Sequence, residues 1–185
     1  MTIRKIQMKK INSFFRRLYH KMVLVTSDKT TSRIARQMFL KYMDESKFRY
    51  RISNDQTHIE SGFDLSDGHF TNVHYTFEPD QKRIFVQSYF LTIEADQISL
   101  AALLIAHLNT LMRSGSMKIN FQRLQVYFEH DVSYSSVVLA PNELDNFHHY
   151  MVWMPKEFLW CFNQVLDANE DPVVVMGEFI RKCGM

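Results

Sequence analysis

The hydrophobic pattern at the start of the chain has the period of α-helices. Residues 3–23 place apolar side chains on one helical face: Ile11, Phe14, Phe15, Leu18 and Met22. A polar break follows, and Thr30, Thr31 and Ser32 each carry a hydroxyl that suits a helix N-cap. A second helix is therefore predicted from about Thr31 to Asp44. Two buried faces fit it: Ile34, Met38 and Phe39, or Ala35, Met38 and Tyr42.

The next part of the chain alternates apolar and polar residues with the period of β-strands. Four strands are predicted, at Phe48–Ile52, Thr57–Leu65, Thr71–Phe77 and Arg83–Leu91. Asp67-Gly68 lies between the second and third, and this dipeptide is typical of a tight hairpin. Because the strands have hairpin spacing and no helices alternate with them, we expect an antiparallel four-strand meander.

The segment from Ile98 to Met112 is the clearest helix, and it carries no formal charge. Its apolar residues form two stripes, whereas a surface helix needs only one. The helix is therefore either enclosed within the monomer or packed on the sheet with one face and on a partner with the other. We favour the second arrangement, with a partner or dimer surface made by Leu100, Leu103, Leu104 and Leu111.

The last part of the chain is predicted to hold a β-hairpin and several helices. Two strands cover 117–121 and 126–128 and turn at Gln122-Arg123, and Val137–Leu139 is a further short strand. A helical region opens at Pro141-Asn142. Proline suits the first turn of a helix, so Pro155 and Pro172 are each expected to start a new one. The fold class is therefore α+β: helix, four-strand meander, central helix, hairpin and C-terminal helices.

This order of elements, together with one local motif, resembles a known family. The motif is Leu108-Asn109, then Gly115, then the alternating runs 117–121 and 126–128. The chain is similar, over Thr30 to Ala168, to the YbjN-like group of bacterial sensory transduction regulators, which have a type III secretion chaperone-like fold. It departs from the group at Gln122-Arg123, where glycine or an acidic residue is usual. The resemblance implies a non-enzymatic domain that dimerises and holds other proteins, with no catalytic residues to carry over.

Composition and motifs argue against an enzyme. The chain has 5 Gly and lacks the glycine-rich loops that cradle phosphates. Cys161 lies among aromatic residues, where burial opposes thiolate formation, and Cys183 shows no disulfide framework with it. His148 and His149 would point about 100° apart on a helix, so a shared metal site is disfavoured. We expect no catalytic residues, no metal and no cofactor.

Charge is distributed unevenly along the chain. Residues 1–27 contain seven basic residues and no acidic residue, and since the whole chain carries +2, the remainder is net acidic by about five charges. The chain is therefore divided into residues 1–29, a basic amphipathic helix and a break, and 30–185, one α+β domain. An anionic-surface contact is predicted for Lys5, Lys9, Lys10, Arg16 and Arg17.

Two functions are consistent with these patterns. The first is a non-enzymatic protein-binding or chaperone-like regulatory module, expected to be a homodimer. The alternative is a regulator that associates with an anionic membrane surface through the basic helix, or with nucleic acid, which the near-balanced net charge disfavours. Since no membrane span and no signal peptide are evident, a cytoplasmic location is expected.

Overall fold

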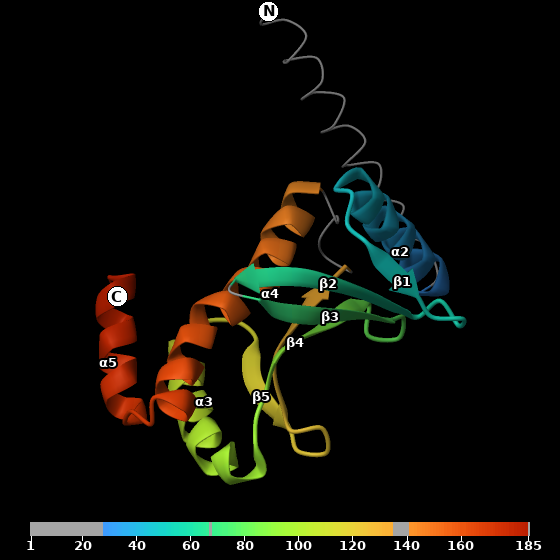
Figure 1. Cartoon of the computed structure of the whole chain (residues 1–185). Helices are drawn as coiled ribbons and strands as arrows, with labels where there is room; N and C mark the ends of the chain where they lie inside the picture. Colours follow the sequence, from blue (N-terminus) through green and yellow to red (C-terminus); the bar gives the residue numbers. More distant parts are fainter. Residues whose placement is uncertain (1–27, 67, 135–140, 185) are drawn as a thin grey trace, which may run out of the picture.

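The computed structural model describes residues 28–66, 68–134 and 141–184. Its elements are α2 (Asp28–Glu45), β1 (Tyr50–Ile52), β2 (His58–Ser66), β3 (His69–Glu78), β4 (Arg83–Thr92), the 3-10 turn η1 (Ala95–Gln97), α3 (Ile98–Leu111), β5 (Ser116–Asn120), β6 (Gln125–Ser133), α4 (Pro141–Phe162), the π-helical turn η2 (Asn163–Asp167) and α5 (Pro172–Cys183). The predicted strand Val137–Leu139 lies outside the described residues. The predicted α+β class and the order of elements are confirmed over this part of the chain (Figure 1).

The strands form one antiparallel sheet with the order β1-β2-β3-β4-β6-β5. The meander is confirmed, with Ile59 opposite Tyr75 and Tyr75 opposite Val86. The hairpin of β5 and β6 joins the same sheet, because β6 pairs with β4 and Tyr127 lies opposite Tyr89. The two edges of the sheet are therefore β1, which has three residues, and β5.

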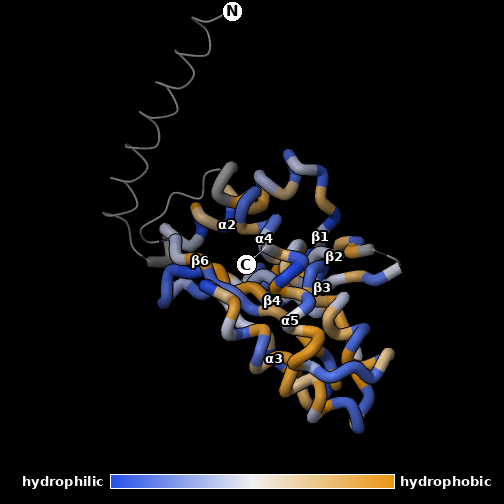
Figure 2. The backbone as a smooth tube through the Cα atoms, turned by 90° about the vertical axis from the view of Figure 1, so that its left-hand side faces the viewer, coloured by the Kyte–Doolittle hydropathy of each residue, from blue (hydrophilic) through white to orange (hydrophobic). Residues whose placement is uncertain are grey.

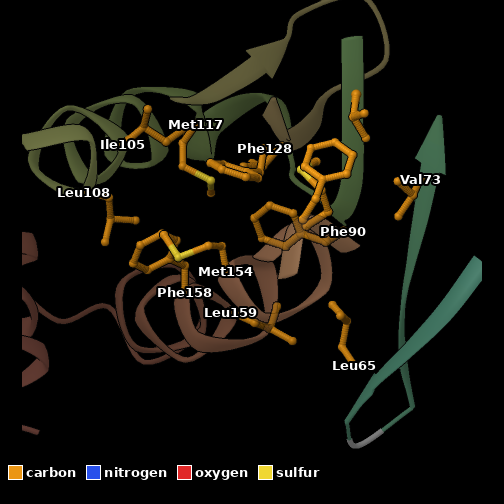
Figure 3. Packing of buried hydrophobic residues seen from close by; sticks show 14 of the residues in the cluster. Leu65, Val73, Phe90, Ile105, Leu108, Met117, Phe128, Met154, Phe158 and Leu159 are labelled. Atoms are coloured by element: carbon orange, nitrogen blue, oxygen red, sulfur yellow. The ribbon is translucent and has the colours of Figure 1, made fainter. Parts of the chain in front are cut away.

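The hydrophobic core lies between one face of the sheet and the helices. Alternate residues of β3 and β4 are buried, including Val73, Tyr75 and Val86, while their neighbours in sequence stay partly exposed. From α4, Met154 and Phe158 point toward Leu108 and Phe128 (Figure 3). Figure 2 shows the hydrophobic stretches gathered in the strands and around α3 and α5. Side chains of both α3 and α4 thus contribute to one core.

Helix α2 differs from its predicted start and from both predicted faces. It begins at Asp28, so the Thr31 hydroxyl lies within the helix and not at its cap. The buried face is mixed, since Ala35, Phe39 and Tyr42 are all buried. The reason is the position of the sheet: the Phe39 ring packs 4.8 Å from that of Tyr75, centroid to centroid. Aromatic contacts with the sheet therefore select the face.

Pro155 was expected to start a helix, and this is wrong. It lies inside α4, which continues from Pro141 to Phe162. A proline within a helix loses one backbone hydrogen bond and costs about 3 kcal/mol. Met154 and Phe158 on either side are buried in the core, and we infer that this burial offsets the cost. Pro172 does start α5, as expected, and the Asp171 side chain accepts from the amide of Val173 at 2.8 Å.

The motif residue Asn109 holds the edge of the sheet. Its side-chain Oδ1 accepts from the amide of Met117 at 2.8 Å, and its Nδ2 donates to the Met117 carbonyl at 3.1 Å. One side-chain amide thereby satisfies both outward backbone groups of a residue in the edge strand β5. An edge strand with unpaired backbone groups invites pairing with another chain, so Asn109 protects this position.

Candidate functional site

An apolar groove of about 470 Å³ lies between α4, α5 and the C-terminal end of α3. Helices α3 and α5 lie on the side of the molecule away from α2, and α4 runs from α2 toward them (Figure 1). The groove is lined by Leu111, Met112, Arg113, Tyr150, Trp153, Met154, Glu157, Phe158, Phe179 and Cys183. Eight of these ten residues are aromatic, aliphatic or sulfur-containing, so the groove suits an apolar ligand or protein segment.

The walls of the groove are held in place by specific contacts. The Tyr150 hydroxyl donates to the carbonyl of Ser114 at 2.8 Å and joins α4 to the turn after α3. The ring of Phe158 lies 5.4 Å from that of Phe179, which joins α4 to α5. Since contacts of this kind join all three helices, the groove is formed before any ligand binds.

The rim of the groove is amphipathic. Trp153 is 41% exposed, and its ring stacks on that of His149. Arg113 and Glu157 add one charge of each sign. An exposed tryptophan beside an apolar hollow is typical of the central residues of protein interfaces.

The structure places three of the four predicted partner-surface residues where a partner could reach them. Leu100 and Leu103 are exposed, and Leu111 is partly buried and lines the groove. Because Leu103, His107 and Leu111 follow one another at a spacing of four residues, they form a stripe along α3 that runs into the groove. His107, between these two leucines, is partly exposed on that stripe.

Leu104 is a correction to the predicted surface. It is fully buried, and α3 packs against α5 as well as against the sheet. We therefore remove Leu104 from the partner surface. The apolar character of both stripes suggests a partner for the second one, but Leu104 on that stripe is covered within this chain.

The cysteines lie at the interface of α4 and α5. Cys161 is buried, and this burial raises the pKa of its thiol to about 12. Cys183 at the end of α5 is exposed and lines the groove, and partial desolvation raises its pKa as well. A thiol with a raised pKa is a poor nucleophile at neutral pH, so neither residue is activated for catalysis.

His148 and His149 diverge, as the helical geometry predicts. His148 points into the core, where its Nδ1 shares a 3.0 Å hydrogen bond with the Tyr75 hydroxyl. His149 is exposed and stacks on Trp153. In the part of the chain that the structure describes, no three His, Cys, Asp or Glu side chains gather in a metal-binding arrangement.

Lys5, Lys9, Lys10, Arg16 and Arg17 lie outside the described residues, so their predicted contact with anionic surfaces stays a prediction. Of the helices in 28–66, 68–134 and 141–184, none has the length and apolar character to cross a bilayer.

Sequence reasoning did not identify the groove residues of α4 and α5. Tyr150, Met154 and Phe158 recur every four residues, and this spacing marks one helical face. The pattern predicts a helix, but a sequence does not show which part of an apolar face a neighbouring helix leaves uncovered.

Comparison with known proteins supports a likeness of fold. No protein-family model matches the chain, and no curated protein matches it. The crystal structure of YbjN from E. coli, described as a candidate transcription regulator, superposes with a TM-score of 0.50 at 9% sequence identity. The match covers 66% of this chain and 89% of YbjN. The chain therefore has a YbjN-like α+β fold.

Proposed function

We propose that this chain is a non-enzymatic, chaperone-like regulatory module that binds an apolar segment of another protein. The observation that carries the proposal is the preformed groove between α3, α4 and α5, with Trp153 at its rim. The likeness to YbjN, whose description names a transcription regulator, is consistent with a regulatory role.

The chemistry of the groove favours a protein segment over a small polar substrate. Met112 and Met154 are flexible and polarizable, so they adapt to side chains of different shape. Phe158 and Phe179 supply large apolar surfaces, and an amphipathic helix buries its apolar face in grooves of this kind. We expect the bound segment to present aliphatic or aromatic residues at helical spacing.

A homodimer is part of the same proposal. Leu100 and Leu103 remain exposed in the N-terminal half of α3, at 36% and 47%. Exposed leucines on a helix that otherwise packs in the core are candidates for contact with a second copy. Light scattering of the full chain at micromolar concentration measures this directly.

The test combines affinity purification from the native cell with matched variants. Trp153→Ser and Leu103→Ser each remove an exposed apolar side chain at the proposed surface. Phe121→Ser is the control, since Phe121 is 66% exposed in the turn between β5 and β6, away from the groove. We expect Trp153→Ser to lose the partner, identified by mass spectrometry, and Phe121→Ser to retain it.

Two results would refute this proposal. One is a wild-type chain that retains no protein above the level of an unrelated control. The other is a partner that all three variants retain equally, because binding would then involve another surface.

A further inference from the structure

A second, polar hollow of about 630 Å³ lies away from the groove, over the sheet edge formed by β1, β2 and β3. Its lining includes Arg49, Arg51, Glu60, Gly62, Asn72 and His74. Unlike the groove, it is lined mainly by polar and charged residues. Its volume is within the range of small-molecule sites.

The register of the sheet brings these residues together. Arg51 lies opposite Glu60, and Glu60 lies opposite His74, so the three side chains share a row on the face away from the core. Gly62 lies opposite Asn72 in the next row. Because Gly62 has no side chain, the space above this part of the sheet stays open.

The cationic side of the hollow has two arginines. Neither the Arg49 nor the Arg51 guanidinium has a hydrogen-bond or ion-pair partner among the described residues. The Ser61 hydroxyl donates to the backbone carbonyl of Arg49 at 2.7 Å and thereby fixes the start of β1. Residues 28–185 carry more acidic than basic side chains. Two unpaired guanidinium groups beside one hollow therefore give this surface the opposite charge to the rest of the domain.

The other side of the hollow offers hydrogen-bond acceptors and an amide. The Glu60 carboxylate lies 3.5 Å from Nδ1 of His74 and keeps further lone pairs open to solvent. Desolvation lowers the pKa of His74, which disfavours a full ion pair between its ring and the Glu60 carboxylate near neutral pH. The Asn72 side chain supplies both a donor and an acceptor.

We propose that this hollow binds a small phosphate ester that carries sugar hydroxyls, as a sugar phosphate or a nucleotide does. Arg49 and Arg51 bind the phosphate, because planar guanidinium groups donate paired hydrogen bonds to its oxygens. Glu60 and Asn72 accept from the sugar hydroxyls, as carboxylates do from ribose in nucleotide sites. The site is separate from the groove and does not depend on the proposed protein-binding function.

The test uses isothermal titration calorimetry of the full chain with AMP, ribose 5-phosphate, adenosine and inorganic phosphate. Gly62→Val is the sharpest variant, because it fills the hollow and leaves every charge in place. A Cβ at Gly62 would lie 3.6 Å from Oδ1 of Asn72, an ordinary contact, and valine suits a strand, so this variant should fold. Arg49→Ala and Arg51→Ala remove the cations, and Arg181→Ala on α5 removes an exposed arginine elsewhere.

We expect an ester to bind with a dissociation constant below about 1 mM, and Gly62→Val and Arg51→Ala each to weaken it by roughly tenfold or more. Arg181→Ala should bind as the wild type does. Binding of AMP alone would assign a nucleotide, and equal binding of ribose 5-phosphate would assign the sugar phosphate.

Three results would overturn the assignment: no ester binds; inorganic phosphate binds as tightly as the esters; or Gly62→Val and the arginine variants bind as well as the wild type. The last result would indicate binding elsewhere on the chain, for example at the basic residues before Asp28. Thermal melting of each variant shows whether a loss of binding reflects unfolding.

Discussion

The buried histidine His148 should make the stability of the protein depend on pH. It is 8% exposed, its ring stacks on that of Phe48 at 4.4 Å, and its Nδ1 shares a hydrogen bond with the Tyr75 hydroxyl. Several elements contribute the groups that face it. They are Tyr42 of α2, Phe48 just before β1, Phe63 of β2, Tyr75 of β3, and Asp145 and His149 of α4. Asp145 is the only carboxylate among them. It favours the protonated ring of His148, whereas the mainly apolar surroundings favour the neutral ring.

Burial lowers the pKa of His148 from 6.5 to about 4, because desolvation disfavours the imidazolium more than Asp145 favours it. The unfolded chain therefore binds more protons than the folded chain between these two pH values. The contribution of His148 to stability is complete above pH 6.5 and is lost as the pH falls toward about 4. Each pH unit in this window is worth about 1.4 kcal/mol, so the loss at pH 5 is about 2 kcal/mol.

Urea denaturation at about pH 7.5 and about pH 5 measures this loss in the wild type and in His148→Gln, whose amide can still hydrogen-bond to Tyr75 but does not titrate. Between about pH 7.5 and about pH 5, we expect the free energy of unfolding of the wild type to fall by about 2 kcal/mol more than that of His148→Gln. His107→Gln, on the partly exposed stripe of α3, is the control and should keep this excess loss. Equal losses in the wild type and in His148→Gln would refute the reasoning.

Three further predictions concern other parts of the chain. Gly115→Ala should lower the free energy of unfolding by about 2 kcal/mol or more in urea denaturation, because Gly115 has φ +75° and an added Cβ would lie 2.5 Å from Cζ of Phe128; an unchanged midpoint would contradict this. Asn109→Ala should lower the free energy of unfolding by about 1 kcal/mol in the same assay and increase self-association measured by light scattering. The reason is that the backbone N–H and C=O of Met117 lose their hydrogen bonds to Asn109 at the sheet edge. A variant as stable as the wild type would contradict this role. Deleting residues 1–27 should abolish salt-sensitive binding to anionic liposomes or DNA, and a full chain that binds neither at low salt rules the contact out.

The local pattern of the sequence determined most of the secondary structure. Alternation of apolar and polar residues predicted the four strands of the meander, because each strand buries one face and exposes the other. The hairpin around Gln122-Arg123 and the start of α5 at Pro172 were also predictable, since both depend on residues close together in the chain. Pro155 was not, because a helix continues through a proline when core burial compensates for the lost hydrogen bond.

The functional surfaces depended on contacts between residues distant in sequence. The apolar stripe of α3 predicted a surface at Leu103 and Leu111, but only the packing of the folded chain decided that Leu104 is covered. The pairing of β1, β2 and β3 brings Arg51 and His74 to one hollow, although neither stands out in the sequence. The sequence by itself determined which residues are apolar or charged and at what period they recur. Only the tertiary structure decided which of them remain exposed together, because burial depends on what packs against each face.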